Sequence, residues 1–357
     1  MSTIQPPSPT YAIARRALLD AAASAGARVA HHVHPLPGRE GEELAIDVVE
    51  LGDPDARDVV LVVSGTHGVE GYAGSALQLG LLQQAPALPD GVALVLVHAL
   101  NPYGMSWVRR VNEDNVDLNR NFIDWSQPVP HNEGYDRIAD LLVPREWTDA
   151  EQERTLNELL AVAGEVGLGE FQRIVSGGQY HHPTGLFYGG TGPTWSHRWL
   201  REWSADRLGS AERVVMIDLH TGLGPWGVGE LIVSDPTSSA SYARAAAWWG
   251  DVHSMVEGDS VSAVLAGDWQ ATAAGLVPQA EVTTVTIEYG TKDPLTGMQS
   301  LRADAWLHAH GDPTAPEAAA FRAAVRDAYN DDDQAWIDVV WPRCESVVTA
   351  ALEGLRS

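Results

Sequence analysis

The sequence predicts an α/β protein whose sheet contains much parallel pairing and is covered by helices on both faces. Three observations predict this fold class. The strands are short and apolar along their whole length, as in Val92–Val97; helical segments alternate with them; and no repeat or low-complexity block interrupts the series. A continuously apolar strand fits a sheet that is buried on both faces, because successive side chains point to opposite sides.

The elements follow in order from the N-terminus. After a proline-rich start, residues 12–25 are typical of a helix, and residues 27–34 and 43–51 are typical of strands around the turn-rich L-P-G-R-E-G. From there on, strands and helices alternate, with a strand at 58–63, a helix at 70–84 and a strand at 92–97. Later elements are predicted as strands at 213–219, 229–233 and 282–288 and as helices at 149–162, 195–208, 238–249 and 316–329, with a helical tail at 343–355.

Length and hydrophobic content permit one large core. The chain has 357 residues, of which 45% are hydrophobic, and no domain boundary is evident, so we expect a single catalytic domain over residues 1–357. One irregular insert stands out at about 176–193, a glycine-rich loop. A loop of this length inside a compact domain is usually functional or mobile.

Charge and cysteine usage narrow the function classes. A net charge of -25 argues against nucleic acid or an anionic membrane as partner. Lys292 is the only lysine, so a cationic site must be built from guanidinium groups, which suit carboxylates. Cys344 is the single cysteine and cannot form an internal disulfide. With no signal-peptide pattern at the N-terminus, we expect a cytoplasmic protein; the oligomeric state is not predicted.

A histidine and a glutamate follow the strand at 58–63, in the stretch S-G-T-H-G-V-E-G. His67 and Glu70 lie where strand gives way to helix, which is where open α/β sheets place their ligand sites. Their spacing brings an imidazole and a carboxylate to one side of a turn, where both can ligate one divalent ion. The alternative is a solvated histidine beside a glutamate that is favoured at a helix N-terminus.

Two later strands end in groups of the same kind. V-V-M-I-D-L-H ends at His220, which supplies a third ligand, and catalytic zinc commonly keeps three protein ligands and one position for water. V-T-T-V-T-I-E-Y-G carries Glu288 near its end, where a carboxylate beside the metal can act as general base. The alternatives are a hydrogen-bonded core histidine and an exposed acid. We therefore expect one Zn²⁺ per chain.

The segment N-P-Y-G-M-S-W-V-R-R-V-N-E-D-N-V-D-L-N-R-N-F, residues 101–122, carries a family resemblance. Together with the H-x-x-E before it and the strand-end histidine and glutamate after it, this segment resembles the signature of the zinc carboxypeptidases, in the same order from His67 to Glu288. The resemblance implies a three-layer α/β/α fold with a mixed, mostly parallel central sheet. It also implies hydrolysis of an amide bond next to a free carboxylate by metal-activated water.

The resemblance implies roles within this segment. Asn119 and Arg120 would bind the free carboxylate of the substrate, which fits the bidentate geometry of guanidinium. Asp117 would accept a hydrogen bond from the ring of His67 and hold the tautomer of that histidine. Arg110 best matches the arginine that stabilises the oxyanion of the tetrahedral intermediate, with Arg109 as second choice.

Other functions remain as alternatives. D-L-H-T-G also resembles the aspartoacylase and succinylglutamate desuccinylase branch, so the substrate is a small peptide or an N-acyl amino acid. A non-catalytic carboxylate-binding protein would not need the general base. A serine hydrolase is a further alternative, because Ser64, Ser75 and Ser260 lie near glycines. The sequence contains no G-x-S-x-G motif, which argues against this class. Four tyrosines are candidates for the one that secreted carboxypeptidases place over the substrate: Tyr180, Tyr188, Tyr242 and Tyr289.

Overall fold

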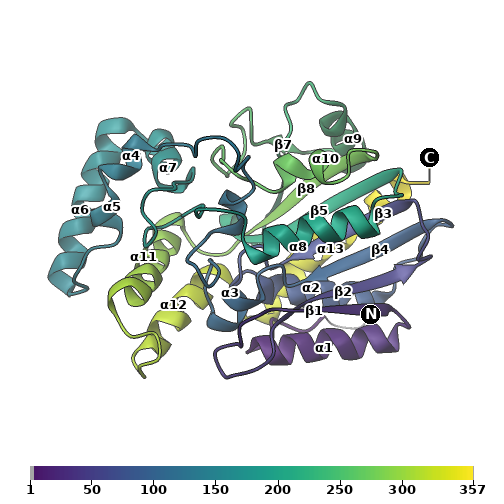
Figure 1. The fold of residues 1–357 in the computed structure, drawn as a ribbon, viewed down its shortest axis with the longest axis horizontal. Helices are drawn as coiled ribbons and strands as arrows, with labels where there is room; N and C mark the ends of the chain where they lie inside the picture. Colours follow the sequence, from purple (N-terminus) through teal and green to yellow (C-terminus); the bar gives the residue numbers. More distant parts are fainter. Residues whose placement is uncertain (1–3, 357) are drawn as a thin grey trace.

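The computed structural model describes residues 4–356 and contains an eight-stranded mixed sheet between two layers of helices (Figure 1). The strand order is β1-β2-β4-β3-β5-β8-β6-β7. The central strands β4, β3, β5 and β8 are mutually parallel. β1 pairs antiparallel with β2, β2 with β4, and β6 with β8, whereas β6 and the short edge strand β7 are parallel. The predicted α/β/α fold class is confirmed. The strands are β1 Arg28–Val33, β2 Ala45–Gly52, β3 Asp58–Ser64, β4 Val92–His98, β5 Arg213–Trp226, β6 Gly229–Val233, β7 His253–Ser254 and β8 Glu281–Gly290.

Helices cover each face of the sheet. α1 (Tyr11–Ser24), α2 (Gly71–Gln84), α9 (Ala240–Trp249) and α13 (Gln334–Gly354) contribute to the apolar cluster on one face. α8 (Trp195–Arg207) and α10 (Ala273–Leu276) contribute to the cluster on the other. Within residues 4–356, no helix combines the length and apolar character needed to cross a lipid bilayer.

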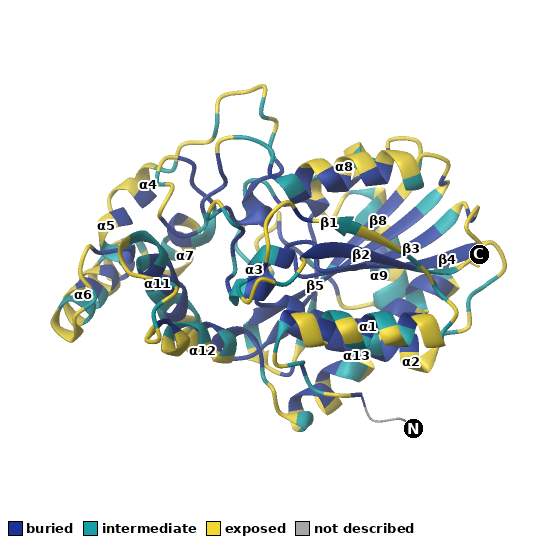
Figure 2. Cartoon of the chain, turned by 60° about the horizontal axis from the view of Figure 1, so that its bottom comes forward, coloured by how far each residue is buried: buried dark blue, intermediate teal, exposed yellow. Residues whose placement is uncertain are grey.

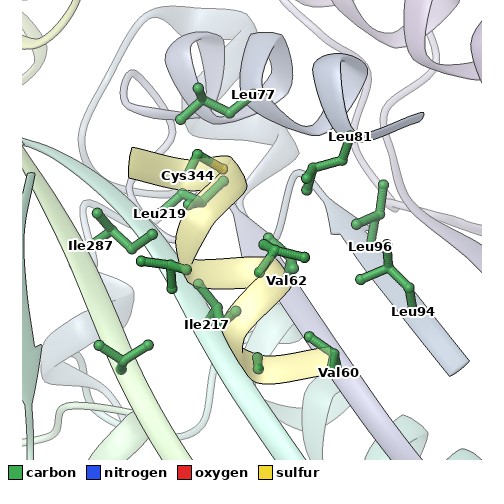
Figure 3. Close-up of a cluster of buried hydrophobic side chains, with 14 of the residues drawn as sticks. Val60, Val62, Leu77, Leu81, Leu94, Leu96, Ile217, Leu219, Ile287 and Cys344 are labelled. Atoms are coloured by element: carbon green, nitrogen blue, oxygen red, sulfur yellow. The ribbon is translucent and has the colours of Figure 1, made fainter. Parts of the chain in front are cut away.

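The two clusters follow from the alternation of side chains along each strand. On β3, Val60 and Val62 belong to the cluster beneath α2 and α13, whereas Val59 and Leu61 belong to the opposite cluster. Figure 3 shows the first cluster, in which Cys344 of α13 lies among the strand side chains. The central strands are buried on both faces, as their continuous apolar sequences predict (Figure 2).

A third group of helices lies at one end of the sheet (Figure 1). Its own apolar side chains form a separate cluster, and the irregular segment that follows α7 runs from this group back towards the sheet. The members are α4 Glu133–Asp136, α5 Ala139–Leu142, α6 Asp149–Val166, α7 Leu168–Ser176, α11 Pro294–His310 and α12 Ala318–Tyr329.

The structure corrects several predicted elements. The strand predicted to end at Leu219 continues to Trp226, because β5 keeps pairing with β8 through a register shift that accommodates the glycines. α11 was not predicted, since its apolar residues do not segregate to one stripe and its buried set includes Arg302 and Asp304. The tail helix begins at Gln334 rather than near 343, with a proline inside it.

Candidate active site

Two glycines let the chain turn sharply after β3. Gly65 has a φ of +68°, a left-handed conformation that glycine adopts without strain. A Cβ on Gly68 would lie 2.1 Å from the backbone carbonyl carbon of Gly104, so the two backbones approach too closely for a side chain. The turn carries His67, and Glu70 follows as the residue directly before α2.

Three side chains converge at this carboxyl end of the sheet. His67 Nδ1 lies 2.9 Å from Glu70 Oε1, and His220 Nδ1 lies 3.1 Å from His67 Nδ1 and 3.0 Å from Glu70 Oε2. All three residues are buried, and they could hold a metal ion. Donor atoms around tetrahedral zinc, with bonds of about 2.0–2.1 Å, are roughly 3.3 Å apart. The donors would therefore need to separate only slightly to fit such an ion.

A carboxylate holds the outer nitrogen of each histidine. Asp117 Oδ1 lies 3.0 Å from His67 Nε2, which also lies 2.8 Å from Arg110 Nη2, and Asp218 Oδ2 lies 2.6 Å from His220 Nε2. Both rings thus present Nδ1 to the cluster. Partners of this kind fix the tautomer of a ligating histidine and raise its basicity, so the environment of the rings also suits metal binding.

Sequence reasoning missed Asp218. It precedes His220 by two residues on β5, and residues at this spacing share a face of a strand, which is the signal that could have found it. Its carboxylate also accepts hydrogen bonds from Thr66 Oγ1 and from Trp269 Nε1, at 2.9 and 2.6 Å. Asp218 is therefore held on three sides.

Charges inside the cluster shift the pKa of two of its three residues. Burial alone would raise the pKa of Glu70, but the neighbouring imidazoles of His67 and His220 outweigh it and lower the pKa below its usual range. Burial opposes protonation of His220, yet Asp218 and Glu70 raise its pKa well above the ordinary value. The site therefore favours positive charge among its carboxylates, and a divalent cation would supply that charge while displacing protons.

Glu288 lies next to His220 because of the strand register. β5 and β8 pair in parallel with His220 directly opposite Glu288. The Glu288 carboxylate is buried and accepts a hydrogen bond from the backbone N–H of Leu223 at 3.1 Å. Burial, followed by the negative charge of Glu70, raises the pKa of Glu288 to about 8. A carboxyl group with a pKa in this range is suited to take up and return a proton near neutral pH.

Arg110 reaches the cluster from the segment after α3 (Pro102–Trp107). Its Nη1 donates to Glu70 Oε1 at 3.0 Å, and its Nε donates to Asp117 Oδ2 at 2.9 Å. Burial opposes the charge, but Asp117 and Glu70 raise the pKa of Arg110 above its ordinary value. The guanidinium is therefore a permanent cation next to the proposed ligands.

Asn119 and Arg120 lie on a 3₁₀ turn, η1 (Leu118–Arg120). Asn119 Oδ1 accepts a hydrogen bond from the backbone N–H of Trp269 at 3.2 Å. Arg120 is buried and donates to the carbonyl oxygen of Ser176 from Nε and Nη2, at 2.9 and 2.6 Å, and to that of Asn119. Burial lowers the pKa of Arg120. In the described part of the chain this guanidinium makes no ion pair within 4.0 Å, so its charge suits an anionic ligand.

Other residues considered from the sequence lie apart from the cluster. Arg109, the second choice for the oxyanion, instead donates from Nε to Asp304 Oδ2 at 2.9 Å. Ser75 and His98 form a buried pair at 2.9 Å, but among the described residues His98 Nδ1 has no partner that could complete a triad. Ser64 is buried and donates to a glutamine side chain. The geometry thus favours Arg110 over Arg109 and offers no serine triad at these positions.

Sequence reasoning also missed Tyr329, the last residue of α12. Burial raises the pKa of its phenol, which interacts electrostatically with Arg110, Glu70 and Glu288. Its backbone carbonyl accepts a hydrogen bond from Thr221 Oγ1, directly after His220 on β5. No local sequence pattern around Tyr329 indicates this position, because α12 reaches the site only through the tertiary fold.

Comparisons with known proteins give a family and a set of similar structures. A family model described as "Protein of unknown function (DUF2817)" matches residues 8–343. Bovine thrombin-activatable fibrinolysis inhibitor, solved in complex with tick carboxypeptidase inhibitor, is 11% identical, with 97% of each chain covered and a TM-score of 0.46. Carboxypeptidase A from Helicoverpa armigera is 13% identical over 92% of this chain and 75% of that chain, with a TM-score of 0.46.

A third similar structure is an aspartoacylase family protein from Mesorhizobium loti. It is 15% identical over 80% of this chain and 67% of that chain, with a TM-score of 0.38. None of the curated proteins matches the chain.

Proposed function

The chain belongs to the family described as "Protein of unknown function (DUF2817)", and we propose that it is a zinc-dependent hydrolase that cleaves an amide bond next to a free carboxylate. One observation carries this proposal. Residues from three strand ends come together: His67 and Glu70 after β3 contact His220 on β5, and Glu288 on β8 is paired directly opposite His220.

The number of ligands supports a catalytic rather than a structural metal. Structural zinc sites usually have four protein ligands, whereas catalytic sites keep three and leave a position open. The cluster offers two imidazoles and one carboxylate within residues 4–356. Glu288 adds a buried acid whose raised pKa suits proton transfer. A pure binding protein would have no use for that group.

The residues divide the chemistry among themselves. A zinc ion held by the three ligands would polarise the scissile carbonyl and lower the pKa of a water molecule. Glu288 takes a proton from the attacking water and returns it to the leaving nitrogen. Arg110 donates hydrogen bonds to the oxygen that gains negative charge. Asn119 and Arg120 bind the substrate carboxylate, which neutralises a buried guanidinium whose hydrogen bonds to the described residues go to backbone carbonyl oxygens.

Two substrate classes fit these groups. A small peptide and an N-acyl amino acid both place an amide bond next to a free carboxylate, so the same residues would act on either. The stretch D-L-H-T-G around His220 favours the second class, by its resemblance to the aspartoacylase branch. A direct comparison of a C-terminally free peptide, its amide and an N-acyl amino acid distinguishes the two.

The deciding variant is Glu288→Gln. It should keep one zinc per chain and the wild-type fold while losing hydrolysis by about 10²–10⁴-fold, the usual contribution of a general base. Glu230→Gln is a matched control, because Glu230 faces Glu288 in the register of β6 and β8 but its carboxylate binds the backbone N–H of Val261. Wild-type turnover by Glu288→Gln would refute the assignment of the base, and a zinc-free active enzyme would refute the metal mechanism.

A further inference from the structure

Phe187 adopts a strained backbone conformation and contacts two arginines of the site. Its φ is +51°, in the left-handed region that a bulky residue rarely adopts. The centroid of its ring lies 5.2 Å from Arg110 Cζ and 5.4 Å from Arg120 Cζ. Strain of this kind persists only where the surroundings enforce it, and it is concentrated at functional sites.

The surroundings of Phe187 do enforce this conformation. The buried Gln179 side chain accepts hydrogen bonds from the backbone N–H groups of His181 and His182 and donates to the carbonyl oxygens of His182 and Leu186. The Gln179 backbone N–H donates to the Phe187 carbonyl at 3.2 Å. One side chain therefore shapes most of the loop before Phe187.

The loop is also attached to the site itself. The carbonyl oxygen of Tyr188 accepts a hydrogen bond from the backbone N–H of Asp117 at 2.8 Å. Asn115 Nδ2 donates to the carbonyl oxygens of Pro183 and Gly185, both at 3.0 Å. The segment that contains Phe187 is thus fixed to the segment that carries both arginines.

The two guanidiniums bind separate partners and repel each other. Arg110 is bonded to Glu70 and Asp117, whereas Arg120 is bonded to backbone carbonyls. Burial is the main cause that lowers the pKa of Arg120, and the positive charge of Arg110 lowers it further. An aromatic ring attracts cations through its quadrupole and can contact two of them. Phe187 is the ring that both arginines share.

We propose that Phe187 is a positioning residue that sets the distance between the Arg110 and Arg120 guanidiniums. This inference rests on the proposed function, in which one arginine serves the developing oxyanion and the other the substrate carboxylate. In a substrate those two groups are separated by a short, fixed stretch of covalent bonds. An ångström of error between the arginines would therefore weaken both contacts at once.

The test is Phe187→Leu, which keeps an apolar side chain but removes the aromatic ring. In this variant kcat/KM for a free-carboxylate substrate should fall on the order of tenfold, with KM raised and kcat lowered, because both arginine contacts loosen. Zinc content should be unchanged. Phe187→Tyr retains the ring and should restore most of the activity.

Phe171→Leu is the matched control. Phe171 is, like Phe187, a partly buried phenylalanine. Both pack against the apolar cluster of the third group of helices, at the end of the sheet. This variant should leave KM and kcat at their wild-type values. An active Phe187→Leu enzyme with wild-type KM and kcat would overturn the proposal, as would an equal loss in Phe171→Leu.

A second readout does not depend on catalysis. The Nε–H groups of Arg110 and Arg120 are hydrogen-bonded, so their NMR signals should exchange slowly with solvent in the wild type and faster in Phe187→Leu. If the wild-type protein hydrolyses none of the substrates, the proposed function fails. Faster exchange of the arginine Nε–H signals in Phe187→Leu would still support the positioning role of Phe187. Unchanged exchange at both arginines overturns the positioning whatever the activity.

Discussion

Replacement of Asp218 by asparagine should weaken metal binding without breaking the fold. Asp218 Oδ2 lies 2.6 Å from His220 Nε2 and accepts a hydrogen bond from Trp269 Nε1, and Oδ1 accepts one from Thr66 Oγ1. The asparagine oxygen can occupy the Oδ2 position and keep both ring N–H donors. Its amide then faces Thr66, whose hydroxyl can rotate to accept. The hydrogen bonds survive and only the negative charge is lost.

The magnitude follows from the role of that charge. A carboxylate behind a ligating histidine raises the basicity of the nitrogen that faces the metal, and its loss typically costs 10–100-fold in metal affinity. This corresponds to about 1.4–2.8 kcal/mol of binding free energy. Burial works against protonation of His220, and Asp218 is the main group that offsets this effect of burial. We therefore expect the loss of zinc affinity to lie towards the upper part of this range.

The assay is zinc competition against a chromophoric chelator, with circular dichroism to check the fold. Asp47→Asn is the matched control, since Asp47 is equally buried and lies 2.5 Å from His31 Nδ1, on a strand remote from the metal ligands. That control should lose stability but bind zinc normally. A folded Asp218→Asn protein with wild-type zinc affinity would refute the reasoning.

Three further predictions concern the carboxylate site, the turn and pH. Arg120→Ala should raise KM for free-carboxylate substrates by about 10–100-fold, the range for a lost charge-assisted pair; an equal loss on the amidated substrate would count against this site. Gly68→Ala should lower the free energy of unfolding by about 1–3 kcal/mol in urea denaturation, because its Cβ meets the Gly104 backbone, and an unchanged midpoint would contradict it. Burial lowers the pKa of His98 from 6.5 to about 4, so the unfolded chain binds more protons between these values and stability falls as pH decreases through them. His98 should contribute about 2 kcal/mol to the difference in unfolding free energy between pH 7 and pH 5, and a His98→Asn variant with the same pH dependence as wild type would exclude it.

Local sequence was enough to find the central strands and to nominate the candidate ligands, although the two-residue edge strand β7 was not predicted. The central strands are buried on both faces, so their apolar runs identify them without knowledge of their neighbours. His67 and Glu70 belong to one turn, and the strand that carries His220 is apolar up to that point. Errors occurred where the pattern was not local: β5 extends through glycines only because β8 pairs with it.

The sequence by itself determined the α/β fold class and which residues could bind a metal, because both depend on residue type and short-range spacing. The tertiary structure alone decided that His220 lies opposite Glu288, that Asp218 holds the outer nitrogen of His220, and that Phe187 contacts two arginines. These relations join segments far apart in the chain, and the order of strands in the sheet and the path of one loop fix them. No short stretch of sequence specifies such distances.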